Sequence, residues 1–182
     1  MGERNDQKVN MLEIGCNEGR SSVWFLQNVL AHEDSRLTVI DTFNDADNYK
    51  KSTAKKTPLQ KVFEANIKEI DAGKKVFVYK GNSQEVMRTM PTMPRFDIAY
   101  IDGSHFVSDV MEDLIYSYRM VKKGGLIICD DYMLGFNGYN DNGYDKWVEK
   151  DLPKNAIDAF IRLFYRDVEV VHSDYLMVLR RK

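Results

Sequence analysis

A glycine turn between an apolar run and a helical pattern, near the start of the chain, constrains the fold most. The segment reads Met11-Leu-Glu-Ile-Gly-Cys-Asn-Glu-Gly-Arg-Ser-Ser22. Gly15 and Gly19 can adopt backbone angles that other residues avoid, and they let a ligand approach the main chain closely. The N–H groups at the start of the following helix favour an anionic group there. The spacing Gly-x-x-x-Gly differs from the Gly-x-Gly-x-x-Gly of dinucleotide sites, so we expect a nucleotide site for a smaller ligand.

Apolar runs alternate with helical patterns along the rest of the chain, and this alternation predicts an α/β fold with a mostly parallel sheet covered on both faces. The last two strands, joined by His172-Ser-Asp174, predict an antiparallel hairpin at one edge. The expected strands are 9–14, 37–40, 76–79, 96–101, 126–129, 168–171 and 175–179. The expected helices are 20–32, 58–70, 84–90, 107–121 and 155–165, and the long expected loops are 42–57 and 132–152.

Composition excludes several classes of protein. The formal net charge of -2 gives no basic surface of the kind that binds nucleic acid. No apolar run approaches the roughly 20 residues of a membrane helix, and residues 2–8 lack the apolar core of a secretory signal. Cys16 and Cys129 are too few for a disulfide framework. We expect one domain over residues 1–182 in the cytoplasm, with neither a nucleic-acid nor a membrane partner.

Polar residues follow four of the expected strands. In an open parallel sheet, ligands bind beyond the carboxyl ends of the strands. The glycine turn follows the first strand, Asp41 the second, Asn82 and Ser83 the third, and Asp102 the fourth. Asp41 could accept both hydroxyls of a ribose, and Ser83 and Gln84 could hydrogen-bond an adenine edge. Any one of these residues could simply end a strand or cap a helix, but all four beside a glycine turn favour a binding site.

These motifs, in this order, resemble those of the class I S-adenosylmethionine-dependent methyltransferases. The resemblance covers about residues 9–181 and implies a Rossmann-like, doubly wound sheet with strand order 3-2-1-4-5-7-6. It also implies S-adenosylmethionine as the cofactor and S-adenosylhomocysteine as its product. The motifs are Glu13-Ile-Gly-Cys-Asn-Glu-Gly, Asp41, Gly81-Asn-Ser-Gln84, Ile101-Asp-Gly-Ser-His105 and Lys123-Gly-Gly-Leu-Ile-Ile128.

The resemblance further implies which residues bind this cofactor. Gly15, Asn17 and Ser21 would surround its methionine part. Asp41 would bind the ribose, and Ser83 and Gln84 would contact the adenine. The expected cofactor-binding residues are Glu13, Gly15, Cys16, Asn17, Gly19, Ser21, Asp41, Thr42, Phe43, Asn82, Ser83, Gln84, Asp102 and Ser104.

Three carboxylates end the fourth and fifth expected strands, namely Asp102, Asp130 and Asp131. Carboxylates that converge in one crevice repel unless a proton or a cation intervenes. Oxygen ligands select a hard ion such as Mg²⁺, with Ca²⁺ or Mn²⁺ as alternatives. The pattern resembles the metal-dependent O-methyltransferases of the catechol and caffeoyl-CoA type and the macrocin-like sugar O-methyltransferases. That resemblance implies Asp102, Asp130 and Asp131 as metal ligands, with Asp102 and His105 as catalytic residues.

The expected chemistry assigns His105 as the general base. A metal lowers the pKa of a bound hydroxyl, and a histidine with a pKa near neutral can remove the proton. Two alternatives stay open. His105 could be a helix-start residue that hydrogen-bonds locally, with Ser104 as the N-cap. Only one carboxylate of the pair Asp130-Asp131 could be functional, as in related enzymes without metal.

The segment after the acidic pair is the expected acceptor wall, because a loop of this length is usually functional or disordered. Its aromatic residues Phe136, Tyr139, Tyr144 and Trp147 could stack on a sugar or phenol ring, although some could simply pack the loop. Relatives of the catechol and caffeoyl-CoA type carry helices before the first strand. We therefore expect either a minimal enzyme or a domain from a longer polypeptide.

The sequence thus predicts an S-adenosylmethionine-dependent O-methyltransferase, assisted by a divalent metal, whose partner is a small-molecule acceptor. A sugar hydroxyl is favoured, with another polyol or a phenol as alternatives, and homo-oligomer formation is left open. The competing predictions are a metal-independent methyltransferase on another acceptor and a non-catalytic S-adenosylmethionine-binding module. Trp24, Met111, Leu114 and Ile115 are expected in the core, whereas His32 and His172 are expected to face solvent; Cys129 should be buried.

Overall fold

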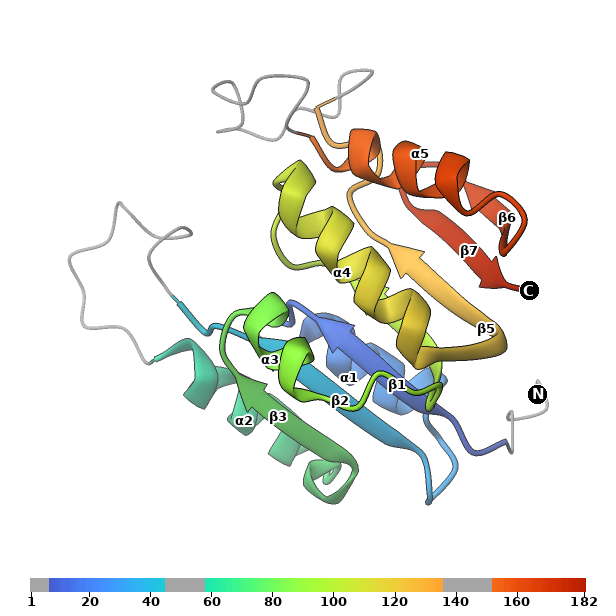
Figure 1. Cartoon of the computed structure of the whole chain (residues 1–182). Coiled ribbons are helices and arrows are strands. Elements are labelled where there is room, and N and C mark those ends of the chain that lie inside the picture. The colour runs from blue at the N-terminus through green and yellow to red at the C-terminus, as the bar shows by residue number, and fades with distance from the viewer. Residues whose placement is uncertain (1–6, 45–57, 136–151) are drawn as a thin grey trace.

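A seven-stranded sheet forms the centre of the molecule, and helices cover both of its faces (Figure 1). The computed structural model describes residues 7–44, 58–135 and 152–182. The strand order β3-β2-β1-β4-β5-β7-β6 confirms the predicted order. The strands are β1 (Asn10–Ile14), β2 (Arg36–Asp41), β3 (Val76–Lys80), β4 (Phe96–Ile101), β5 (Val121–Cys129), β6 (Val168–Ser173) and β7 (Met177–Arg181). The helices are α1 (Arg20–Asn28), α2 (Leu59–Glu69), α3 (Ser83–Thr89), α4 (Val107–Met120) and α5 (Pro153–Leu163), with a short 3-10 helix η1 at Gly73–Lys75.

The strand β1 lies in the middle of the sheet and is buried on both faces. It pairs in parallel with β2 on one side and with β4 on the other, and Met11 and Leu12 are both 0% exposed. A strand in this place needs a nearly continuous apolar run, which the sequence supplies apart from Asn10 and Glu13. At the far edge, β6 and β7 form the predicted antiparallel hairpin, and β7 also pairs antiparallel with β5.

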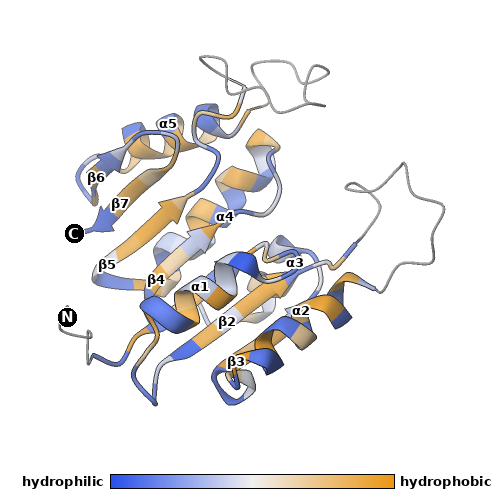
Figure 2. Ribbon diagram, turned by 180° about the vertical axis from the view of Figure 1, so that it is seen from behind, coloured by the Kyte–Doolittle hydropathy of each residue, from blue (hydrophilic) through white to orange (hydrophobic). Residues whose placement is uncertain are grey.

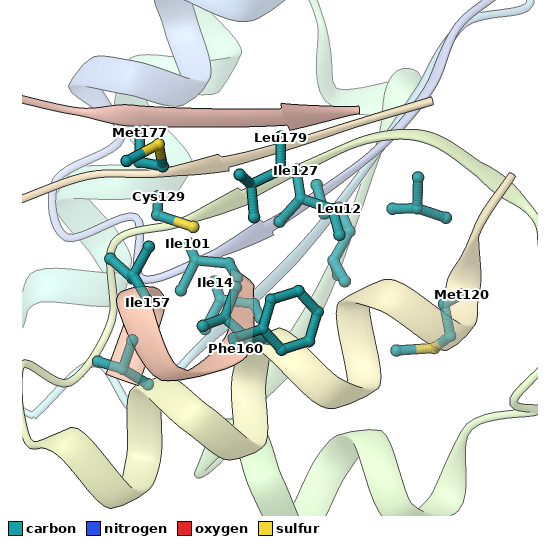
Figure 3. Packing of buried hydrophobic residues seen from close by; sticks show 14 of the residues in the cluster. Leu12, Ile14, Ile101, Met120, Ile127, Cys129, Ile157, Phe160, Met177 and Leu179 are labelled. Carbon is teal, nitrogen blue, oxygen red and sulfur yellow. The ribbon is translucent and has the colours of Figure 1, made fainter. Parts of the chain in front are cut away.

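Two apolar clusters attach the helices to the sheet, one on each face. On one face α4 and α5 pack over strands β1, β4, β5 and β7, and Figure 3 shows Phe160 of α5 among the side chains of these strands. On the other face, Phe25 of α1 and Phe63 of α2 pack against β1 and β2. Figure 2 shows apolar residues concentrated in the strands, whereas the helices carry apolar and polar residues side by side. The sheet is therefore packed against helices on both faces, which fixes where the side chains at the carboxyl ends of its strands lie.

The helix α1 ends at Asn28, four residues earlier than predicted. Beyond it, the ammonium group of Lys75 donates to the carbonyls of Leu30, Ala31 and His32 at 2.8, 3.2 and 2.8 Å. These carbonyls would otherwise lack helical partners. A lysine from a distant part of the chain therefore stabilises the turn that follows α1.

The prediction that Trp24 is a core residue is wrong, because this side chain is 56% exposed. The buried face of α1 is centred on Ser22, Phe25 and Leu26, and position 24 points away from that face at 3.6 residues per turn. On α4, Leu114 is 0% exposed and its neighbours Met111 and Ile115 pack against the same cluster, as predicted. The predicted burial of Cys129 is also confirmed, at 1% exposure.

The strand β5 begins at Val121, directly after α4, rather than at the predicted Leu126. Its pairing with β4 is irregular between Phe96 and Ile98, and Gly124 has a φ of 80°. The glycines predicted to end the helix therefore lie within an irregular strand instead.

The expectations for the two histidines and the two long loops have different outcomes. His172 lies within β6, where it is exposed as predicted, whereas His32 is half-buried. Most of the two expected loops, including Phe136, Tyr139, Tyr144 and Trp147, lies outside the described residues. In the described ranges, no helix is long and apolar enough to cross a membrane.

Candidate functional site

The glycine turn leads from β1 into α1 and lies directly against the end of β4. Gly15, Asn17 and Gly19 have positive φ angles of 79°, 51° and 87°. A Cβ atom on Gly15 would lie 2.0 Å from the carbonyl oxygen of Asp102, so only glycine fits there. The N–H of Asp102 donates to the carbonyl of Ile14 at 2.8 Å. These main-chain contacts hold the turn and Asp102 side by side.

Glu13 lies beneath the turn and is 0% exposed. Its carboxylate accepts hydrogen bonds from the hydroxyls of Ser21 and Ser22 at the start of α1. Burial raises the pKa of Glu13 to about 7, with the charge of Asp41 acting in the same direction and the two serine hydrogen bonds opposing it. Glu13 therefore links the end of β1 to the start of α1 through buried hydrogen bonds.

Asp41, at the end of β2, holds the turn from the other side. One carboxylate oxygen accepts the N–H groups of Cys16 and Asn17 at 2.7 and 2.9 Å, and the other accepts the N–H of Phe43 at 2.6 Å. Both lone pairs of the first oxygen are thus engaged, whereas the second oxygen has one lone pair left for a ligand hydroxyl. The Cys16 side chain is 3% exposed, and burial raises the pKa of its thiol above the usual range. Cys16 therefore contributes its main chain, not a reactive thiolate.

The two predicted residues after Asp41 are engaged locally. The hydroxyl of Thr42 accepts the N–H of Asn44 at 3.3 Å. The ring of Phe43 is buried and lies 5.6 Å from that of Phe63, although its φ is 49°. Positive φ is uncommon for a bulky residue and such strain concentrates at functional sites.

The residues predicted for the adenine lie at the start of α3. The side chain of Asn82 caps this helix by accepting the N–H groups of Gln84 and Glu85 at 3.0 and 3.3 Å. The hydroxyl of Ser83 and the amide Nε2 of Gln84 both donate to Oδ1 of Asp113, at 2.8 and 3.0 Å. Sequence reasoning missed Asp113. An acidic residue on the apolar face of α4, three residues after Val110, was the signal that could have found it.

Asp102, His105 and Asp131 form a close group at the ends of β4 and β5. One ligand atom from each lies within 4.8 Å of the other two. Nε2 of His105 lies 2.6 Å from Oδ2 of Asp131, and the hydroxyl of Tyr175 donates to Oδ1 of the same carboxylate. Like Asn17 and Phe43, Asp131 has a positive φ, at 52°.

The carboxyls of this group differ in their proton affinity. Burial raises the pKa of Asp102 to about 8, and the charges of Asp130, Asp131 and Glu13 add to the effect, whereas the hydrogen bond from Tyr100 opposes it. Burial also acts to raise the pKa of Asp131, but the hydrogen bonds from His105 and Tyr175 outweigh it, so the net shift is downward.

Asp130 lies outside the close group, although the sequence predicted it as a metal ligand. Its Oδ2 accepts a hydrogen bond from the hydroxyl of Tyr100, and its Oδ1 accepts the N–H of Asp131 at 2.9 Å. The Tyr100 hydroxyl also lies 3.4 Å from Oδ2 of Asp102. His105 takes the third place in the group instead. Sequence reasoning missed both Tyr100 and Tyr175.

His105 contacts a distant part of the chain, and the expected N-cap Ser104 is not the residue that precedes α4. Its partner Asp131 is 26 residues away, and α4 begins at Val107 with Phe106, not Ser104, as the N-cap. The hydroxyl of Ser104 donates to Asp109 at 2.6 Å.

A groove of ≈ 330 Å³ lies on another part of the surface, between α2 and β3. It contains none of the predicted site residues, and it is lined by Phe63, Glu64, Ile67, Lys68, Asp71, Gly73, Lys74, Val76 and Val78.

Comparisons with known proteins identify the family and the fold of the chain. Residues 12–132 match the family described as "Methyltransferase domain". A protein of Acanthamoeba polyphaga mimivirus, itself described as uncharacterized, is 29% identical over 130 residues, which cover 71% of this chain and 53% of the viral protein. The chain thus spans about half the length of this curated relative.

Solved structures share the fold. The O-methyltransferase TomG from Streptomyces achromogenes, in complex with S-adenosylmethionine, matches 98% of this chain and 75% of its own, with a TM-score of 0.70 at 17% identity. An O-methyltransferase from Bacillus cereus, in complex with S-adenosylhomocysteine, matches 95% and 74%, with a TM-score of 0.63 at 16% identity. A Podospora anserina methyltransferase with bound S-adenosylhomocysteine matches 96% and 72%, with a TM-score of 0.65 at 15% identity. The chain therefore belongs to the methyltransferase domain family and shares the fold of these methyltransferases.

Proposed function

We propose that the protein transfers a methyl group to a hydroxyl group of a small molecule. The observation that carries this proposal is the close group of Asp102, His105 and Asp131 beside the glycine turn. A hydroxyl is a weak nucleophile until it loses its proton, so an O-methyltransferase needs a proton acceptor next to the methyl donor. The contact between Gly15 and Asp102 supports this adjacency.

The donor site would use the residues expected from the sequence. Gly15, Asn17 and Ser21 would surround the methionine part, Asp41 would accept the ribose hydroxyls, and Ser83 with Gln84 would contact the adenine. Once bound, S-adenosylmethionine supplies a methyl group on a positively charged sulfur, which a nucleophile displaces in line. Glu13, sealed beneath the turn by its two serine partners, would hold the turn in shape.

A divalent metal fits the donor set of the close group. Asp102 and Asp131 would hold it, with His105 of the same group kept as the base, and Asp130 accepts a hydrogen bond from Tyr100 beside the group. The two carboxylates suit Mg²⁺ or Mn²⁺, because both ions prefer oxygen ligands. When bound, such an ion lowers the pKa of an acceptor hydroxyl and orients its oxygen.

His105 would receive the proton of the acceptor hydroxyl. Asp131 lies against its Nε2 and can accept the Nε2–H, which holds the ring in one orientation. With Nε2–H donating to Asp131, Nδ1 is the ring atom that takes up a proton. Tyr175 holds Asp131 from the opposite side and so maintains the orientation of the pair. Correct positioning of this kind is the main source of rate enhancement in such displacements.

We assign the acceptor as a sugar hydroxyl, with another polyol or a phenol as the other classes to test. The resemblance to sugar-modifying enzymes and the histidine at position 105 support this choice. The aromatic and polar side chains of residues 136–147, which lie outside the described residues, are of the kind that stack on sugar rings.

The test has two stages. Calorimetric titration with S-adenosylhomocysteine, with Mn²⁺ or Mg²⁺ and again with chelator, should give micromolar or tighter binding. Labelled methyl transfer from S-adenosylmethionine to panels of sugars and phenols should then depend on His105. A His105→Gln variant should lose at least about 100-fold in turnover, whereas the matched His172→Gln variant, changed at an exposed position of β6, should be unaffected. Equal turnover in both variants would refute the role of His105, and absence of binding would refute the methyltransferase itself.

A further inference from the structure

The helix α4 carries a carboxyl group in the interior of the protein. Asp113 is 0% exposed and lies on the same helix face as Val110, Leu114 and Ser117. Burying a carboxyl group costs free energy unless it is well hydrogen-bonded, and an apolar residue would pack this face at lower cost. A buried acid in this place therefore calls for a specific task.

The contacts of Asp113 are concentrated on one oxygen. Oδ1 accepts hydrogen bonds from the hydroxyl of Ser83 at 2.8 Å and from Nε2 of Gln84 at 3.0 Å. Oδ2 is buried and has no hydrogen-bond partner among the described residues. The carboxyl group thus serves the first turn of α3, which lies 29 and 30 residues earlier in the chain.

These contacts decide how the amide of Gln84 is turned. Nε2 faces two acceptors, Oδ1 of Asp113 and the main-chain carbonyl of Asp109 at 3.4 Å. An amide has two donor hydrogens on nitrogen and only acceptor sites on oxygen. Its Nε2 must therefore point inward to Asp113, and Oε1 is left as the group that the side chain offers to a ligand. This orientation holds whether Asp113 is charged or carries its proton on Oδ2, because Oδ1 accepts in both cases.

We propose that Asp113 is a positioning residue that sets the base specificity of the methyl donor site by orienting the amide of Gln84. This inference rests on the proposed contact of Ser83 and Gln84 with adenine. An acceptor oxygen at that place bonds the 6-amino group of adenine and cannot bond the 6-oxo group of hypoxanthine or guanine. Asp113 would thus select 6-aminopurines without touching the ligand itself.

The expected size of the effect follows from the hydrogen bond that is lost. A 6-oxopurine ligand would place its carbonyl oxygen against Oε1 of Gln84, which leaves both of these acceptors unpaired. Its affinity should therefore be about 10- to 100-fold lower than that of the adenine ligand. If Asp113 is replaced by an apolar residue, the Gln84 amide can rotate and present either end. The preference should then fall toward equal affinity, even where overall affinity changes little.

The experiment compares two ligands on a set of variants. Calorimetry would measure the dissociation constants of S-adenosylhomocysteine and of its hypoxanthine analogue, in which a carbonyl replaces the 6-amino group. Asp113→Leu should lose the preference for the adenine ligand. Asp113→Asn should keep it, because the Asn carbonyl can accept the same two hydrogen bonds. The matched control is Ser117→Ala, which removes another buried polar group one turn further along α4. Its hydroxyl, unlike Oδ1 of Asp113, has no hydrogen-bond partner among the described residues.

A second variant keeps the inference testable if Asp113→Leu does not fold. Gln84→Met leaves Asp113 in place, removes the amide and should abolish the preference. Full preference in either Asp113→Leu or Gln84→Met would overturn the inference, as would loss of preference in Ser117→Ala. A wild-type protein that binds neither ligand would overturn the proposed function and this inference with it. Failure of the inference alone looks different, because S-adenosylhomocysteine then binds but the ratio of affinities does not respond to Asp113.

Discussion

The buried Glu13 makes the stability of the protein dependent on pH in a way that one substitution can isolate. Its pKa is raised from 4.5 to about 7, so the folded state binds the proton more tightly than the unfolded state does. The stability that this proton affinity contributes is full below about pH 4.5 and is lost as the pH rises through about 7. With about 1.4 kcal/mol for each tenfold change in proton affinity, Glu13 should reduce the free energy of unfolding by about 2 kcal/mol between about pH 5.5 and about pH 8.

The substitution Glu13→Gln should remove this contribution while keeping the shape of the side chain. Urea unfolding at the two pH values gives the free energy of unfolding of wild type and variant. Asp102 and Asp113, whose raised pKa values act with the same sign, are present in both proteins. The effect of Asp113 cancels in the difference, and that of Asp102 cancels apart from the small contribution that the Glu13 charge makes to its pKa. That difference should change by about 2 kcal/mol between the two pH values. The exposed Glu69→Gln is the matched control and should show no such change. Equal pH dependence in wild type and Glu13→Gln would refute the reasoning.

Three further predictions concern the glycine turn, Lys75 and the proposed metal site. Gly15→Ala should abolish S-adenosylhomocysteine binding or folding, since its Cβ would lie 2.0 Å from a carbonyl oxygen. The control Gly73→Ala, with no atom within 4 Å of the new Cβ, should melt and bind like wild type. A functional Gly15→Ala protein would contradict the packing. Lys75→Met should cost about 1–3 kcal/mol in urea unfolding, because three carbonyls lose a charged donor; an unchanged midpoint would show that water replaces it. In calorimetric titration with Mn²⁺, Asp131→Asn should weaken metal binding at least about tenfold, and Asp130→Asn should weaken it less. The reverse order would favour Asp130 as the metal ligand, as the sequence predicted.

The topology could be read from the sequence because its signals are local. Each apolar run is long enough for one strand, and the glycine turn marks where β1 ends. The same reasoning failed for Trp24, since an apolar residue on a short helix can fall on either side of the buried face. It also misplaced the start of β5, because Lys122–Gly125 has the composition of a helix end but pairs as an irregular strand.

The composition of the site was harder to predict, since it depends on contacts between distant segments. The sequence placed Asp102 and Asp131 correctly at the ends of adjacent strands. It could not show that Tyr100 would hydrogen-bond Asp130, or that Nε2 of His105 would lie 2.6 Å from Asp131. Tyr175 reaches Asp131 from the β6–β7 hairpin across 44 residues of sequence, and no local pattern marks such a contact.

The close approach of Gly15 to the carbonyl oxygen of Asp102 has a mechanical consequence. No side chain separates the two segments, and the N–H of Asp102 bonds the strand that leads into the turn. The glycine turn and Asp102 therefore meet through main-chain atoms, and a hinge at this contact would have to break it. Under the proposed function, the distance over which the methyl group travels is set by main-chain atoms. Side chains and loops around the acceptor can then diversify from one substrate to another while this distance stays the same.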